Sequence, residues 1–184
     1  MKATASLFVL AGALLAGACA EGRAIFNVDV YSFLAGTGQD TIPYIIPPFT
    51  SGSASNAPQT VSLPGGFGSS IVDSVRISSG SVDLINTGGT GTLGFQLYIA
   101  ADSLGALNPS ALALTVPPTN VSGPGTTSVP ISGDLSAAFN SLFSQSTIWA
   151  RVAVAGTNAG ATPVTGDMAL TALRLRIVFQ DKLF

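Results

Sequence analysis

The stretch from Ser69 to Asp102, SSIVDSVRISSGSVDLINTGGTGTLGFQLYIAAD, decides the fold of this chain. Apolar and polar residues alternate along it, which is typical of β-strands that bury one face. The inward residues are Val75 and Ile77 in the first segment, and Val82 and Leu84 in the second. Because the alternation changes phase between the two segments, a turn or a β-bulge must lie between them.

Ser79-Gly80 stands at this change of phase, and a two-residue turn there predicts a hairpin. In that register Ile77 faces Val82, while Arg76 and Asp83 form an ion pair on the opposite face. Glycines at positions 88, 89 and 91 predict a second turn. A third strand follows, whose inward side chains are Leu93, Phe95, Leu97 and Ile99. The stretch therefore predicts three successive antiparallel strands.

The same alternation predicts further strands, among them residues 24–34, 147–155 and 169–179. Residues 156–167, rich in Gly, Thr and Ala, are expected to form a long loop between the last two. One helix is expected near residues 135–143, with Asp134 as its N-cap and one apolar face: Leu135, Ala138, Phe139, Leu142 and Phe143. The sequence thus predicts an all-β fold, a single antiparallel β-sandwich of about eight or nine strands, broadly immunoglobulin-like, with one short helix.

The composition fits one domain with few charges. Charged residues make up 9% of the 184, far below the roughly 25% of ordinary soluble domains. Without Lys2 in a cleaved leader, the net charge is about −3, and no basic cluster is visible in the sequence. Nucleic acid is therefore not an expected partner, because phosphate backbones are bound by several Lys or Arg side chains.

The N-terminus carries the pattern of a secretory signal: Met1-Lys2 and then a short apolar run rich in Ala and Leu. Cleavage after Ala20 fits the small-x-small rule. The segment Leu15-Ala16-Gly17-Ala18-Cys19 also resembles the lipobox of bacterial lipoproteins, although the leucine stands one residue further from the cysteine than is usual. The resemblance implies a signal peptide over residues 1–18, lipidation of Cys19, and a sandwich domain over 19–184. Ala20 after the cysteine is compatible with sorting to an outer membrane.

Two surface sites are candidates for binding. The apolar segment from Ile42 to Phe49 contains three prolines and is expected to be an edge strand or loop that covers the core, or alternatively a docking surface for a membrane or partner. Its candidate docking residues are Ile42, Tyr44, Ile45, Ile46 and Phe49. Tyr98 and Trp149 stand opposite the apolar side of their strands and form a candidate carbohydrate platform, unless a helix or loop covers them.

The residue content restricts catalysis. The chain has no His, and its one Cys is Cys19, which excludes Ser-His-Asp and Cys-His nucleophiles and His-ligated zinc. The carboxylates are scattered, and no run of Asp residues suits calcium. We expect no enzyme activity, no metal and no cofactor. The expected function is a structural or interaction module, exported to the cell envelope on a lipid anchor or secreted, which self-associates or binds a protein partner. The alternative is a module that binds carbohydrate or another small ligand.

Overall fold

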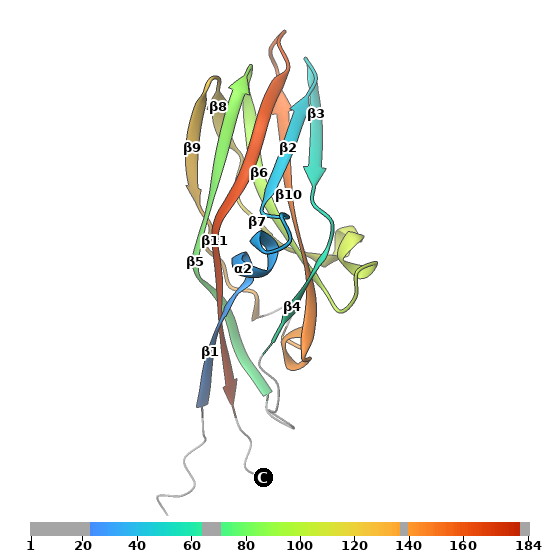
Figure 1. Cartoon of the computed structure of the whole chain (residues 1–184), viewed down its shortest axis with the longest axis vertical. Helices are drawn as coiled ribbons and strands as arrows, with labels where there is room; N and C mark the ends of the chain where they lie inside the picture. Colours follow the sequence, from blue (N-terminus) through green and yellow to red (C-terminus); the bar gives the residue numbers. More distant parts are fainter. Residues whose placement is uncertain (1–22, 64–70, 137–139, 181–184) are drawn as a thin grey trace, which may run out of the picture.

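The computed structural model of the chain describes residues 23–63, 71–136 and 140–180. They form two antiparallel sheets that pack face to face along the long axis of the molecule (Figure 1). The first sheet contains β1 (Arg23–Asp29), β2 (Thr41–Ile46), β5 (Ile71–Gly88), β9 (Gly125–Pro130) and β11 (Val164–Gln180). The second contains β3 (Thr50–Ser55), β4 (Gln59–Ser62), β6 (Thr90–Ala100), β7 (Leu112–Thr115), β8 (Thr119–Ser122) and β10 (Thr147–Asn158). The predicted all-β sandwich is confirmed.

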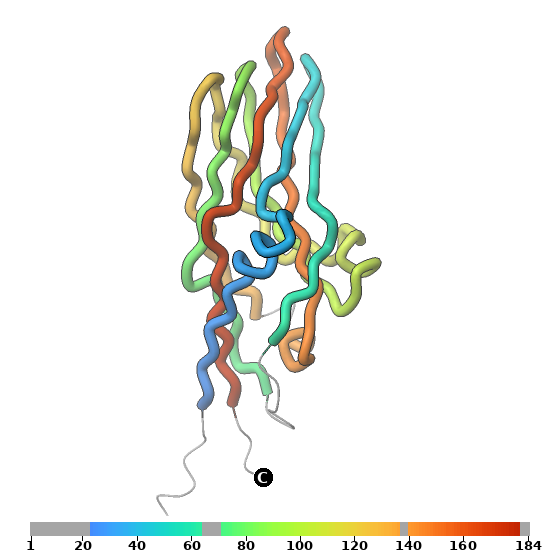
Figure 2. The backbone as a smooth tube through the Cα atoms, in the orientation of Figure 1, coloured from blue at the N-terminus to red at the C-terminus, as the bar shows by residue number. Residues whose placement is uncertain are grey.

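The described residues hold more strands than the eight or nine expected, because several edge positions are each filled by two short strands. β1 and β2 both pair with β11, at opposite ends of that strand. β3 and β4 share β10 in the same way, and β7 and β8 share β6. β1 and the end of β11 pair along one end of the molecule, where the chain enters and leaves the sandwich (Figure 2).

The predicted turn at Ser79-Gly80 is wrong. β5 continues through it as one strand of 18 residues, and the change of phase is absorbed by irregular pairing with β11. The register shifts between Leu170 and Ala172, and again between Arg174 and Leu175. A β-bulge changes the facing of a strand without reversing it, so the apolar residues on both sides of Gly80 still enter the core.

The expected strand over residues 24–34 is correct only in its first half. β1 ends at Asp29, and α2 (Val30–Ala35) follows. The Asp29 carboxylate accepts a hydrogen bond from the backbone N–H of Ser32 at 3.3 Å and so caps the helix. Val30 and Leu34, four residues apart, are both buried, and this spacing serves a helix as well as a strand.

The predicted helix near residues 135–143 lies partly outside the described residues. Ser136 is helical, and a 3₁₀ turn, η4 (Leu142–Ser144), ends the segment. Leu135 and Phe143, two of the expected apolar residues, are buried in the main core. In the part of the chain that the structure describes, no helix is both long enough and apolar enough to cross a bilayer.

The core lies between the sheets, and alternation identified its central side chains correctly. All four inward residues predicted for β6 are at most 2% exposed. In the last strand, every second residue is equally buried: Leu173, Leu175, Ile177 and Phe179. The turn after β5 is also confirmed, and Gly89 adopts a positive φ of 72° there, which favours glycine.

Candidate functional site

The predicted docking segment divides into a core side and a solvent side. β2 is an edge strand paired with β11, and Ile42, Tyr44 and Ile46 are at most 3% exposed. The remaining two candidate residues point outward, Ile45 at 74% exposure and Phe49 at 73%. The first three residues are therefore part of the core, and only Ile45 and Phe49 are accessible to a partner.

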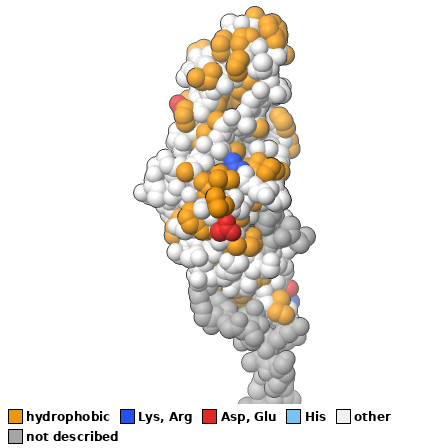
Figure 3. All heavy atoms as spheres, turned by 90° about the vertical axis from the view of Figure 1, so that its right-hand side faces the viewer, with side chains coloured by type: hydrophobic (Ala, Val, Ile, Leu, Met, Phe, Trp, Pro, Cys, Tyr) orange, Lys and Arg blue, Asp and Glu red, His pale blue; other side chains and the backbone are white. Residues whose placement is uncertain are grey.

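Phe49 is unusual in its backbone as well as in its exposure. It lies in the three-residue connection between β2 and β3 and has a φ of +58°, in the left-handed region. Among the described residues it is the only one other than glycine with a positive φ. This region disfavours bulky L-residues, by roughly 1–2 kcal/mol. Hydrophobic side chains gather at the end of the molecule where the connection between β2 and β3 lies (Figure 3).

Tyr44 connects β2 to the centre of its sheet. Its hydroxyl donates a hydrogen bond to the carbonyl oxygen of Ile85 in β5, at 3.3 Å, across the intervening strand β11. Burial, and after it the nearby Asp167 carboxylate, raises the pKa of the Tyr44 hydroxyl to about 12. The tyrosine therefore stays neutral in the folded chain until strongly alkaline pH.

Tyr98 and Trp149 lie on neighbouring strands, as the hypothesis of a carbohydrate platform requires, but neither side chain is fully exposed to solvent. β6 and β10 pair so that Tyr98 faces Arg151 and Trp149 faces Ala100. Both aromatic residues are partly buried against Ala106 and the loop around it. The covering element is thus the loop that carries η2 (Gly105–Leu107) and η3 (Pro109–Ala111), and not the predicted helix.

Arg151 occupies one face of the Tyr98 ring. Its guanidinium carbon lies 3.8 Å from the ring centroid, and its Nε donates to the carbonyl oxygen of Ala106 at 2.8 Å. Arg151 is 9% exposed, so this cation–π contact is largely desolvated. The arrangement holds the loop on the sheet, and a sugar could stack only on what remains of these two rings.

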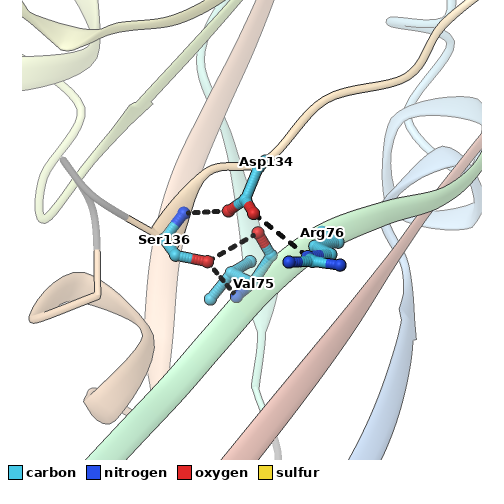
Figure 4. Close-up of polar contacts among 4 residues, drawn as sticks. All are labelled: Val75, Arg76, Asp134 and Ser136. Atoms are coloured by element: carbon cyan, nitrogen blue, oxygen red, sulfur yellow. Dashed lines mark hydrogen bonds and ion pairs between the residues drawn. The ribbon is translucent and has the colours of Figure 1, made fainter.

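A second polar cluster anchors the segment before β10 to the first sheet (Figure 4). Asp134 lies 3.0 Å from the Nε of Arg76, and its other oxygen accepts from the backbone N–H of Ser136 at 2.9 Å. The hydroxyl and N–H of Ser136, and then Arg76, hold the pKa of the Asp134 carboxyl below its usual range.

The predicted ion pair between Arg76 and Asp83 is wrong, because β5 does not fold back at Ser79-Gly80. Asp83 instead accepts a hydrogen bond from Ser128 of β9.

The described residues contain no group of three carboxylate, Cys or His side chains that could hold a metal ion. Cys19, the candidate lipidation site, lies outside the described residues.

Two features of the structure were not predicted from the sequence. The left-handed Phe49 had one signal: a three-residue connection often contains a residue in the left-handed region, and position 49 offers no glycine for it. The second feature is that most of the described arginines belong to strands of the first sheet, and no sequence signal predicts this, because it depends on strand order.

No protein-family model matches the sequence, and no curated protein matches it. In structure, the chain is distantly similar to chains of infectious bursal disease virus. The match to the Gt strain has 9% identity and a TM-score of 0.42, and covers 88% of this chain and 38% of the viral one. The match to the Gx strain has 11% identity and a TM-score of 0.38, and covers 89% and 33%. The chain therefore spans little more than a third of these viral chains, and similarity at this level indicates nothing about its function.

Proposed function

We propose that this chain is a non-catalytic interaction module of the cell envelope, exported and anchored through a lipid on Cys19. The observation that carries the interaction role is Phe49, a large aromatic side chain held outward in a left-handed backbone conformation. Strained residues of this kind cluster at functional sites, and glycine would adopt the same backbone conformation without the strain.

The energetic argument has two parts. The left-handed conformation costs roughly 1–2 kcal/mol for a residue with a Cβ. Leaving a phenylalanine side chain in water forgoes a further ~2 kcal/mol of apolar burial. A partner surface that covers Phe49 and the exposed Ile45 would recover the second part. In the isolated chain, neither the left-handed conformation nor the exposed side chain contributes to stability.

The proposed anchor agrees with the arrangement of the strands. Cys19 precedes the first residue of β1 by four positions. β1 begins at the end of the molecule remote from the connection between β2 and β3 (Figure 1). A chain held in a membrane at Cys19 would therefore present Phe49 away from that membrane, toward partners in the surrounding compartment.

The anchor is tested by intact mass and detergent partitioning of the protein isolated from its own host. We expect the mass of a diacyl or triacyl group on Cys19, and partitioning into the detergent phase. Cys19→Ala should move the protein into the aqueous phase, because a lipid chain contributes about 0.8 kcal/mol per buried CH₂. An unmodified chain that begins at Glu21 would show that the protein is secreted without an anchor.

Phe49→Gly should separate stability from interaction. We expect the melting temperature to rise by about 2–4 °C, since glycine removes roughly 1 kcal/mol of backbone strain. We also expect loss of the cross-linked product that a photoreactive residue at position 45 forms in the host envelope. The matched control is Leu104→Gly, which removes an equally exposed side chain, 78% accessible, that has no positive φ. An unchanged cross-link in Phe49→Gly, or equal loss in Leu104→Gly, would contradict the proposal.

A further inference from the structure

Four of the five arginines in the described residues lie on the outer face of the first sheet. Arg23 belongs to β1, Arg76 to β5, and Arg174 and Arg176 to β11. All four are exposed, and they alternate with side chains buried in the core. A chain in which 9% of residues are charged thus concentrates most of its cations on one surface.

Three of these arginines converge on one depression. Arg23, Arg76 and Arg176 line a shallow groove of about 290 Å³, together with Asp73 and Ser74. The pairing of β5 with β11 places Arg76 directly opposite Arg176. Like charges opposite each other on antiparallel strands destabilise a sheet. Repulsion between Arg76 and Arg176 therefore destabilises the sheet here, and a bound anion would reduce this repulsion.

The charges in the groove do not cancel. Arg76 is paired with Asp134 at 3.0 Å, and Arg174, just outside the groove, lies 3.4 Å from Asp29. Within the described residues, no ion pair involves Arg23 or Arg176. Among the described residues, Asp73 is the only carboxylate that lines the groove. Counted over the part of the chain that the structure describes, two guanidinium groups without an ion pair face one carboxylate, which makes this a cationic site on a protein whose net charge is negative.

The chemistry of the lining selects an oxyanion. Guanidinium groups present planar pairs of N–H donors that match phosphate oxygens, and they remain charged at any physiological pH. The hydroxyl of Ser74 adds a neutral donor. We propose that this groove binds the phosphate group of an anionic lipid headgroup.

The choice of a lipid as the source of the phosphate rests on the proposed anchor. Arg23 follows Cys19 by four positions, and an extended chain of that length spans at most about 14 Å. An acylated Cys19 would hold Arg23 close to the headgroup layer. The groove would then orient the sandwich on its membrane, where each basic residue near an anionic surface contributes to binding.

The test is sedimentation with lipid vesicles, using the chain from residue 20 onward, which retains every described core residue and lacks Cys19. We expect binding to vesicles with about one third phosphatidylglycerol, and not to pure phosphatidylcholine, at about 0.1 M salt. Arg23→Gln and Arg176→Gln should each weaken binding about fivefold, and the double variant about 25-fold. The matched control is Arg174→Gln, which removes the same charge from the same face outside the groove and should change binding less than twofold.

Three results would overturn the assignment to a lipid headgroup. One is equal binding to the two kinds of vesicle, and another is a loss in Arg174→Gln as large as in Arg176→Gln. The third is a shift of the melting temperature by inorganic phosphate, abolished in Arg176→Gln, in a protein that binds neither vesicle.

The intact mass of the protein from its host, which shows whether Cys19 is acylated, tests the anchor separately from the groove. Unmodified Cys19 with vesicle binding refutes only the anchor, and acylated Cys19 without vesicle binding refutes only the groove.

Discussion

Gly166→Ala should destabilise the protein by at least about 3 kcal/mol, which is a large share of the stability of a domain of this size. Gly166 lies in β11 with a φ of +157°, beside a shift in the register with β5. A Cβ atom at this position would overlap the backbone carbonyl oxygen of Ile85 and would lie 2.7 Å from the hydroxyl of Tyr44. Backbone cannot move aside as a flexible side chain can, so the two central strands of the sheet would have to separate.

Urea unfolding of the wild type and the variant measures this effect. The matched control is Gly38→Ala, because Gly38 also has a positive φ, +68°, but no atom lies within 4 Å of its added Cβ. Gly38→Ala should cost only about 1 kcal/mol, the penalty of the backbone conformation alone. Equal losses in the two variants would mean that the close approach of β5 and β11 at Gly166 is not rigid.

Alkaline pH should destabilise the protein through Tyr44. Its pKa is raised from 10.0 to about 12 in the folded chain, so folding favours the neutral hydroxyl. The corresponding stability is complete below pH 10, the pKa of the unfolded state, and is lost as the pH rises from 10 through about 12. Two pKa units correspond to about 2–3 kcal/mol. In absorbance titration, one of the three tyrosines should ionise with a midpoint near 12.

The control for this prediction is Tyr44→Phe. The variant loses one long hydrogen bond to Ile85, which lowers its stability at neutral pH by roughly 1 kcal/mol. Between pH 10 and 12, the free energy of unfolding should fall more steeply in the wild type than in the variant. Parallel curves would show that the hydroxyl is hydrated in the folded chain.

Alternation of side chains was sufficient to predict the sandwich and its core, because burial on one face of a strand has a period that the sequence must carry. It could not distinguish a bulge from a turn at Ser79-Gly80. The choice between the two depends on the strand that pairs with this position, around Arg174, which follows almost a hundred residues later in the sequence. The expected loop over 156–167 was too long for a related reason. Gly156 and Gly166 stand where neighbouring backbone comes close, so these glycines belong to strands and not to a flexible connection.

The candidate sites were less predictable than the fold. Arg174 and Arg176 alternate with buried residues of β11, but their convergence with Arg23 depends on the pairing of β1 with β11. Ile45 and Phe49 belonged to a recognised apolar segment, and only the pairing of β2 assigns three other residues of that segment to the core. Pairing between distant segments, and not local pattern, decides which side chains of an edge strand remain accessible.

The position of β11 has a consequence for the order in which the protein can fold. This strand is the last of the sandwich to be synthesised, yet it lies at the centre of its sheet and pairs with β1, β2 and β5. The first sheet therefore lacks its middle until the ribosome has passed residue 180. Contacts this distant in sequence form slowly, because a long loop must close before they are gained. Assembly of the first sheet therefore has to wait for β11, and a chain halted before that strand would leave β1, β2 and β5 without their common partner.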